Sequence, residues 1–270
     1  MLMYPKFDPV AISLGPLKVH WYGLMYLLSF LFFLYGGKWR IRKFGHPVLT
    51  EKMIDDFLFY GALGTVLGGR LGYCLFYQPA YYLTHPLDIV KTWDGGMSFH
   101  GGMIGVLVAI YIFSRKINTT FFVLGDFVTP FIPVCLMFGR IGNFINGELW
   151  GRFCSPTLPW GMVFPQSGSM LPRHPSQLYE ALTEGVLLFL VLLIFTTSKK
   201  RNLGQTAGVF LIGYGIARFV LEFFRAPDAF ATGVVQSTGL SLGQYYSLPM
   251  ILAGVIVLSW GLKSKSPIEH

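Results

Sequence analysis

The sequence predicts an all-α integral membrane protein, a seven-transmembrane-helix bundle with a small extracytoplasmic cap. Hydrophobic residues make up 53% of the 270 residues and charged residues only 13%, whereas a soluble domain carries about 25% charged residues. Apolar runs long enough to span a bilayer recur along the chain. The basic residues lie mainly in short loops between these runs, which is typical of membrane topology and argues against nucleic-acid binding.

Seven segments are candidates for spanning helices, each of which needs about 20 mostly apolar residues. They are residues 19–37, 53–77, 97–114, 120–142, 177–197, 205–224 and 244–262. The second carries Arg70, the fourth Arg140, and the sixth Arg218 and Glu222. No internal repeat or low-complexity tract is visible, so we expect a single polytopic membrane domain over residues 1–270.

The loop charges predict the orientation of the bundle. Twelve of the 21 Lys and Arg residues fall in alternate loops and the C-terminal tail, and six fall on the opposite side. Because positively charged loops remain in the cytoplasm, we expect the N-terminus outside and the C-terminus inside. The sequence shows no cleavable signal peptide before the first apolar run.

The segments expected on the outer side are long and rich in Pro, Gly and aromatic residues. They cover about residues 78–96, 143–176 and 225–243, and we expect them to form the cap. Residues 1–17 are expected to lie along the membrane interface as a short amphipathic arm.

Metal and disulfide chemistry find no support in the sequence. The three cysteines, Cys74, Cys135 and Cys154, have no metal-ligand spacing and are odd in number. We therefore expect no metal and no cofactor, with the cysteines in helices acting as small apolar residues.

Charged residues inside apolar segments are costly and indicate a functional site. Arg140 is followed by Asn143, Asn146 and Glu148 within nine residues. On a helix, Asn143 and Gly147 share the face of Arg140. This run is more polar than helix packing requires.

A second polar stripe lies on the sixth segment. Tyr214, Arg218, Glu222 and Arg225 recur at helical spacing on an otherwise apolar helix. An intrahelical Arg218–Glu222 pair and an Arg225 that reaches towards water would explain the charges structurally, but they do not explain Tyr214.

Three further polar positions lie near predicted helix ends. His100 lies among four glycines, a pattern found where backbone lines a cavity. His174 precedes the fifth segment, where Ser176 is a candidate N-cap. Tyr22 begins the first segment, where an aromatic belt is the alternative explanation.

These polar residues share one predicted depth, near the outer ends of their helices. They are Tyr22, His100, Arg140, Asn143, Glu148, His174, Glu180, Arg218 and Glu222. Two arginines at one depth favour a phosphate, because guanidinium offers bidentate donors and stays charged when desolvated. A phosphate at that depth is a phospholipid headgroup, so the sequence predicts a protein that handles lipid phosphate.

The same residues carry a family resemblance. The chain closely resembles the bacterial prolipoprotein diacylglyceryl transferases at residues 20–26, 68–70, 94–102, 139–151, 173–180 and 213–215, and at Arg218, Glu222 and Arg225. The long run at 139–151 is the family signature. The segment 152–172 is rather short, which affects the expected shape of the cap.

The resemblance implies a reaction in the bacterial cell (inner) membrane, with the active site towards the extracytoplasmic side. The diacylglyceryl group of phosphatidylglycerol would pass to the lipobox cysteine in a preprolipoprotein signal peptide, forming a thioether and releasing glycerol phosphate. A thiol with a pKa of about 8.5 requires a base, for which His100 is the candidate, although His100 could instead shape the pocket. Arg140 and Arg218 would neutralise the departing phosphate.

The expected site has a catalytic and a binding part. The catalytic residues are His100, Arg140 and Arg218. The substrate-binding residues are Tyr22, Arg140, Asn143, Asn146, Glu148, Gly151, His174, Glu180, Tyr214 and Glu222. Among these, Asn143, Tyr22 and Tyr214 are expected to orient the headgroup, and Glu148 and Glu222 to position the arginines.

Two other functions use similar residues. A transporter for an anionic solute would continue its polar residues across the membrane, yet they become sparse towards the cytoplasmic side. A phosphatidyl transferase usually needs paired carboxylates for a divalent metal, and Asp55 and Asp56 lie at the cytoplasmic end.

Overall fold

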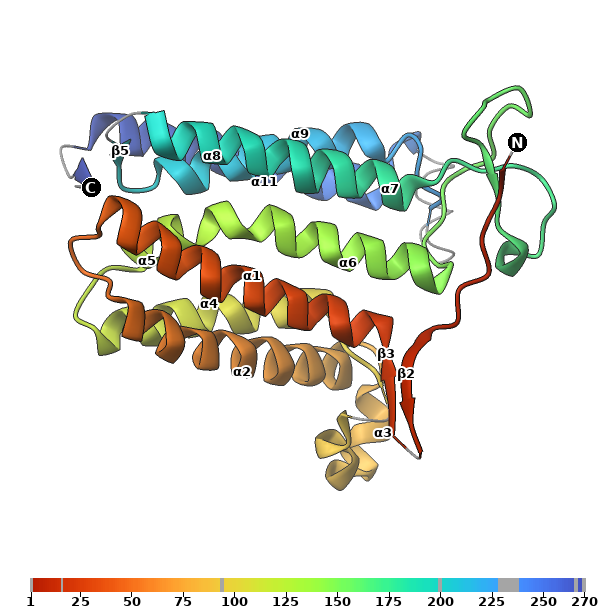
Figure 1. Ribbon diagram of the computed structural model, residues 1–270, viewed down its shortest axis with the longest axis horizontal. Helices are drawn as coiled ribbons and strands as arrows, with labels where there is room; N and C mark the ends of the chain where they lie inside the picture. Colours follow the sequence, from red (N-terminus) through yellow and green to blue (C-terminus); the bar gives the residue numbers. More distant parts are fainter. Residues whose placement is uncertain are drawn as a thin grey trace. The chain divides into compact units, whose positions relative to one another are not determined.

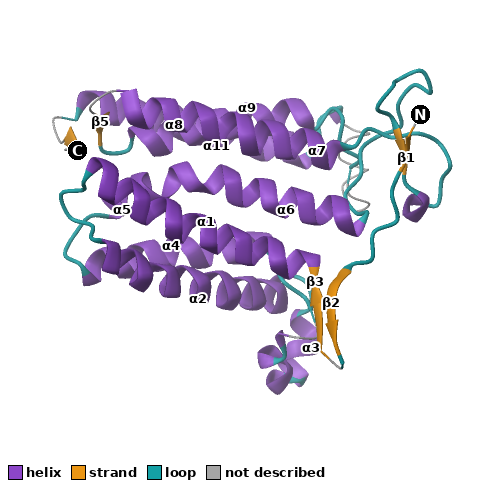
Figure 2. Ribbon diagram, viewed as in Figure 1, coloured by secondary structure: helices purple, strands orange, loops and turns teal. Residues whose placement is uncertain are grey.

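The computed structural model describes residues 2–15, 17–92, 95–198, 201–227, 238–264 and 267–268. The chain divides into two compact units, a first unit of residues 1–32 and 128–268 and a second unit of residues 33–127. Both are built mainly of helices (Figure 1), and the short strands lie at helix ends and in loops (Figure 2).

The first unit holds most of the helices. Its elements are β1 (Leu2–Met3), β2 (Val10–Leu14), β3 (Leu17–His20), the start of α1 (Trp21–Phe44), η3 (Thr129–Phe131), α6 (Ile132–Asn146), β4 (Met162–Val163), η4 (Pro165–Ser167), α7 (Ser176–Glu180), the π-helix η5 (Ala181–Leu187), α8 (Leu188–Ser198), β5 (Arg201–Asn202), α9 (Gln205–Leu221), α11 (Leu242–Lys263) and β6 (Pro267–Ile268).

The second unit contains the rest of α1 and the helices that follow it. Its elements are α2 (Glu51–Phe76), α3 (Pro79–Thr84), η1 (Pro86–Val90), α4 (Phe99–Lys116) and α5 (Phe121–Val128), the last residue of which belongs to the first unit.

The seven predicted apolar segments are mainly helical, although residues 19–20 belong to β3 and residues 222–224 follow the end of α9. Three described helices are both long and apolar enough to cross a membrane: Phe121–Asn146, Ser176–Thr197 and Leu242–Lys263. A shorter apolar helix covers Gln205–Leu221. The prediction of a mainly helical protein is therefore confirmed, with three described helices that are long and apolar enough to cross a membrane.

The N-terminal residues form short strands. β1 pairs in parallel with β4, and β2 pairs antiparallel with β3. The Tyr4 hydroxyl lies 2.7 Å from each of the carbonyl oxygens of Phe144 and Ile145, and its single proton is shared between them. These carbonyls belong to the last turn of α6, where regular backbone donors run out. The Phe144 carbonyl also accepts from the Gly147 amide at 3.0 Å, and Tyr4 adds a side-chain donor to this end of α6. It packs there with Phe164.

Helices α2 and α4 pack closely within the second unit along a seam of glycines. A Cβ on Gly64 would lie 2.5 Å from the carbonyl oxygen of Gly105, and one on Gly72 would lie 2.7 Å from the Cα of Gly101. Such small residues let helix backbones approach closely in membrane proteins. Replacing them with larger residues would force the two helices apart.

Arg70 is buried in α2, and its guanidinium donates hydrogen bonds to neighbouring backbone carbonyls. It donates hydrogen bonds to the carbonyls of Ile89 at 2.8 Å and Asp88 at 2.6 Å, and also to that of Gly95. Because a buried charge needs partners, these carbonyls explain how the second apolar segment tolerates Arg70. The arginine fixes η1 against the end of α2.

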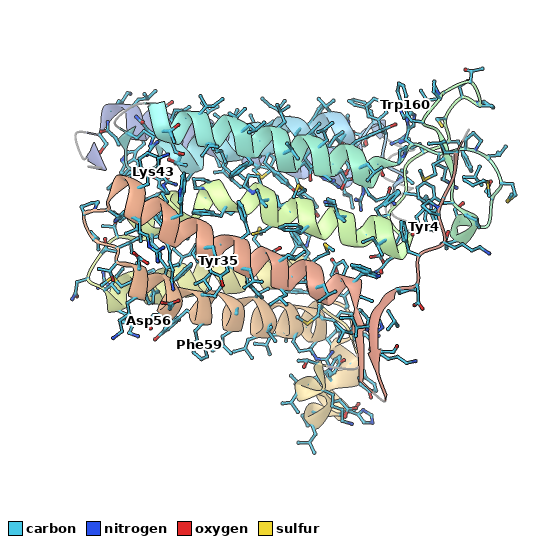
Figure 3. The ribbon with its side chains drawn as sticks, viewed as in Figure 1. Tyr4, Tyr35, Lys43, Asp56, Phe59 and Trp160 are labelled. Carbon is cyan, nitrogen blue, oxygen red and sulfur yellow. The ribbon has the colours of Figure 1, made fainter. Side chains whose placement is uncertain are left out.

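Several large apolar side chains of the second unit face outward. Tyr35 on α1 is 67% exposed and Phe59 on α2 is 66% exposed, and both project away from their helices (Figure 3). Exposed aromatic residues on apolar helices suit contact with lipid.

Candidate active site

Arg140 lies in the last two turns of α6 and forms the first part of a buried ion-pair network. Its Nε lies 2.6 Å from Glu180 Oε2, and its Nη2 lies 3.8 Å from Glu184 Oε2. Glu180 is 1% exposed and Glu184 is fully buried. Charges so far from water require opposite charges nearby, which these residues supply to one another.

Glu180 ends α7 and Glu184 lies in η5, one turn further along. The π-helix widens the turn between two regular helical segments, a feature frequent at functional sites. Gly185 lets η5 approach α6, because a Cβ there would lie 2.5 Å from Met137 Cβ. The two carboxylates therefore reach Arg140 from a helix packed closely on α6.

Arg218 joins the same network from the last turn of α9. Its Nη1 lies 3.5 Å from Glu180 Oε2 and 3.5 Å from Glu184 Oε1. Its Nη2 pairs with Glu222 Oε1, one turn along the chain. The predicted Arg218–Glu222 pair is thus confirmed. Arg218 also lies close to the carboxylates of Glu180 and Glu184 on another helical segment.

Arg225 completes the set. Its Nη1 lies 3.4 Å from Glu180 Oε1 and its Nε lies 3.9 Å from Glu222 Oε1. The network therefore joins Arg140 and Arg218 through Glu180 and Glu184.

The amides that follow Arg140 contact a different carboxylate. Asn143 donates to Glu148 Oε1 at 2.9 Å, and Asn146 donates to the same atom at 3.4 Å. Among the described residues, Glu148 forms no ion pair with an arginine. The expectation that Glu148 positions an arginine is corrected, because α6 ends at a left-handed Gly147 and Glu148 turns back onto the amides.

His174 and Gly151 lie where two loops meet. The Gly151 amide donates to the His174 carbonyl at 2.9 Å, and a Cβ on Gly151 would lie 2.5 Å from that oxygen. His174 Nδ1 lies 3.1 Å from the Tyr179 hydroxyl, to which Trp160 (labelled in Figure 3) also donates. Burial lowers the pKa of His174.

Ser176 does not cap the fifth helical segment. It is the first residue of α7, with Pro175 at the N-cap, and its hydroxyl donates to the Leu149 carbonyl at 3.1 Å. The expected N-cap is wrong because the hydroxyl satisfies a loop carbonyl instead.

The two tyrosines lie beside the helices that carry the arginines. The Tyr22 ring packs on Gly142 of α6, where a Cβ would lie 2.9 Å from Tyr22 Cδ2. Tyr214 precedes Arg218 by one turn and stacks on Phe210 with 5.7 Å between ring centroids.

His100 belongs to the second unit. It is the second residue of α4, follows the N-cap Ser98, and has an exposed side chain in ring contact with Phe99. Trp93 and Asp94 of the predicted outer segment 78–96 lie outside the described residues, as do residues 228–237 of the segment 225–243.

Glu184 is the site residue that sequence reasoning missed. The available signal was its spacing, because it follows Glu180 by four residues inside an apolar segment. In the described part of the chain, no three His, Cys, Asp or Glu side chains gather as a metal site.

Apolar helices long enough to cross a membrane, together with a buried network of arginines and carboxylates, define a helical membrane protein with a polar site inside its helices. The model of the prolipoprotein diacylglyceryl transferase family matches residues 9–260. The chain belongs to this family and is a transferase.

Individual relatives match over nearly the whole chain. The phosphatidylglycerol–prolipoprotein diacylglyceryl transferase of Bordetella avium is 56% identical over 269 residues, covering 99% of this chain and 100% of the relative. The protein of that name from Paracidovorax citrulli is 54% identical over 266 residues, covering 96% and 97%.

Proposed function

We propose that this transferase moves the diacylglyceryl group of phosphatidylglycerol to the lipobox cysteine thiol in a preprolipoprotein signal peptide. A thioether forms and glycerol phosphate leaves. The relatives' printed names support the lipid and the prolipoprotein as substrates. The observation that carries the proposal is the convergence of Arg140 and Arg218 on the same buried carboxylates.

Arg140 and Arg218 are the proposed phosphate-binding and charge-stabilising groups. As the carbon–oxygen bond to phosphate breaks, negative charge grows on the departing oxygen. Two guanidinium groups in a site with little water stabilise that charge strongly, because they need no reorganisation during the reaction. Glu222 holds Arg218 by a direct ion pair, and we assign it a positioning role.

The remaining predicted residues are proposed to surround the headgroup. Asn143, Tyr22 and Tyr214 would orient it, with support from their places on or beside the helices of the arginines. The other proposed substrate-binding residues are Asn146, Glu148, Gly151, His174 and Glu180.

His100 is proposed as the base that takes the proton from the substrate thiol, since neutral imidazole suits this task near pH 7. His100→Gln should reduce turnover far more than lipid binding. Equal losses of both would assign His100 to the shape of the pocket.

We further propose that residues 1–270 form a single polytopic membrane domain in the bacterial cell (inner) membrane. All seven apolar segments would span it, with the N-terminus outside and the C-terminus inside. Segments 78–96, 143–176 and 225–243 would form the extracytoplasmic cap beside the active site. The distribution of loop charges supports this orientation.

The test uses the purified protein in detergent with phosphatidylglycerol and a lipobox peptide. Mass spectrometry should detect a diacylglyceryl thioether on the peptide cysteine. The gain should vanish with Arg140→Ala and persist with Arg115→Ala, an exposed arginine near the end of α4. Lipid binding without transfer by the unaltered protein would contradict the proposal and favour anion transport.

A further inference from the structure

Six charged side chains of the first unit form one connected set of ion pairs, and their formal charges cancel. They are Arg140, Arg218 and Arg225, and Glu180, Glu184 and Glu222. A phosphodiester that binds here adds one negative charge to a set that is already neutral. Because an uncompensated charge is costly away from water, binding needs a compensating positive charge.

Glu184 is the carboxylate that the arginines hold most loosely. Its closest guanidinium nitrogens are 3.5 Å and 3.8 Å away, longer than the roughly 2.7–2.9 Å of a charge-assisted hydrogen bond. Neither of its carboxylate oxygens accepts a short hydrogen bond from a described residue, and the nearest donor is Arg218 at 3.5 Å. Its side chain is also fully buried.

The other two carboxylates are held more tightly. Glu180 lies 2.6 Å from Arg140 Nε and also pairs with Arg225. Glu222 pairs with Arg218 and accepts a hydrogen bond from the Ser241 hydroxyl at 2.7 Å. Protonating either would break a short contact, whereas protonating Glu184 breaks none.

Of the other groups that face Glu184, only Glu180 could take up a proton, and protonating it would break its 2.6 Å contact with Arg140. The facing groups are Arg140 from α6, Glu180 from α7, and Tyr214 and Arg218 from α9, while α8 carries no titratable residue. Arginine stays protonated in proteins. Tyrosine is ordinarily neutral at pH 7 and gains no proton there.

We propose that Glu184 takes up one proton from solvent when a phosphodiester anion binds to Arg140 and Arg218. The proton forms an O–H bond on the Glu184 carboxylate, so the six groups and the bound phosphodiester together stay neutral. The guanidinium N–H groups of Arg140 and Arg218 that face Glu184 can then donate to the phosphate oxygens instead. This inference rests on the proposed function for the identity of the anion, and it assigns Glu184 a positioning role through the two arginines.

The test is calorimetric binding of phosphatidylglycerol to the full chain in detergent, at about pH 7 in two buffers of different ionisation enthalpy. The buffer dependence of the heat gives the protons taken up, which should be about one per lipid by linkage. Glu184→Gln should bind the lipid with almost no proton uptake. Glu184→Asp, which keeps the carboxylate at the same position, is the matched control and should keep the uptake.

Affinity provides a second measurement that needs no variant. If one proton is taken up on binding, the affinity of the unaltered protein for phosphatidylglycerol should fall about tenfold for each unit by which the pH is raised. Diacylglycerol, which lacks the phosphate, should show no such slope. The transfer assay at the same pH values would separate this effect from loss of the proposed activity.

Three results would overturn the inference. They are lipid binding by the unaltered protein without proton uptake, uptake that persists in Glu184→Gln, and an equal pH slope with diacylglycerol. Each leaves the proposed function intact if transfer to the peptide is still observed. Absence of both binding and transfer would reject the proposed function and the inference with it.

Discussion

The Ser241 hydroxyl donates a hydrogen bond to Glu222 Oε2 at 2.7 Å while also accepting one from the Gln244 amide at 3.2 Å. One side chain therefore caps α11 and fixes a carboxylate of the ion-pair network. Because Glu222 in turn pairs with Arg218, the start of α11 is linked to a proposed phosphate-binding residue.

Ser241→Ala should lower both stability and activity. Loss of an N-cap typically costs about 1 kcal/mol, and Glu222 also loses a buried donor, which costs about 1–3 kcal/mol more. Thermal unfolding in detergent would measure the loss of stability, and the transfer assay would measure the loss of activity. Ser241→Thr, which keeps the hydroxyl, should restore most of both; an equally damaged Thr variant would contradict this role.

Arg218→Lys should lower kcat/KM by about 100-fold or more, since an ammonium lacks the planar fork of donors that serves several partners. The protein should remain folded, because the positive charge is retained. Arg115→Lys is the matched control on an exposed helix end and should leave activity unchanged. Comparable activity of the two variants would remove Arg218 from the site.

Gly105→Ala should destabilise the second unit by about 1–3 kcal/mol, the usual range for overpacking. The added methyl group would meet the backbone of Gly64 in the seam between α2 and α4. The control is Gly61→Ala on the partner helix α2, where nothing lies within 4 Å of the new Cβ. The free energy of unfolding of the Gly61→Ala variant should rise by less than about 1 kcal/mol. Equal effects in a thermal unfolding assay would argue against the seam.

Acidification should loosen the loops joined at His174. Burial lowers the pKa of His174 below its ordinary value of 6.5, so the unfolded chain binds more protons than the folded one as pH falls through 6.5. Stability therefore rises with pH in this window and is lost below it. The protection of the Gly151 amide, which bonds to the His174 carbonyl, should fall as pH falls through 6.5, when its hydrogen-exchange rate is compared with the intrinsic rate at the same pH.

The control for this pH effect is His174→Gln, which removes the titrating group while keeping a polar side chain. Its exchange rate at Gly151, corrected for intrinsic chemistry, should lose the acid dependence. An unchanged acid response in the variant would assign the effect to another group.

Helical periodicity and apolar length predicted the helices well, because these features are local. Bilayer thickness and backbone hydrogen bonding dictate long apolar helices whatever their neighbours. The short strand pairs were not predicted: β1 pairs with β4 across more than half of the chain, and two-residue strands leave no periodic signal.

The sequence by itself determined that this is a helical membrane protein, that Arg140 and Arg218 are the unusual charges in it, and which family it belongs to. Residue types and their spacing carry that information directly. Only the tertiary structure decided which carboxylates meet the arginines. Glu148, adjacent in sequence, turns to the amides of α6, whereas Glu180 and Glu184 reach Arg140 from a helix packed on it. Ion pairs form by proximity in space, which helix packing sets and sequence separation does not.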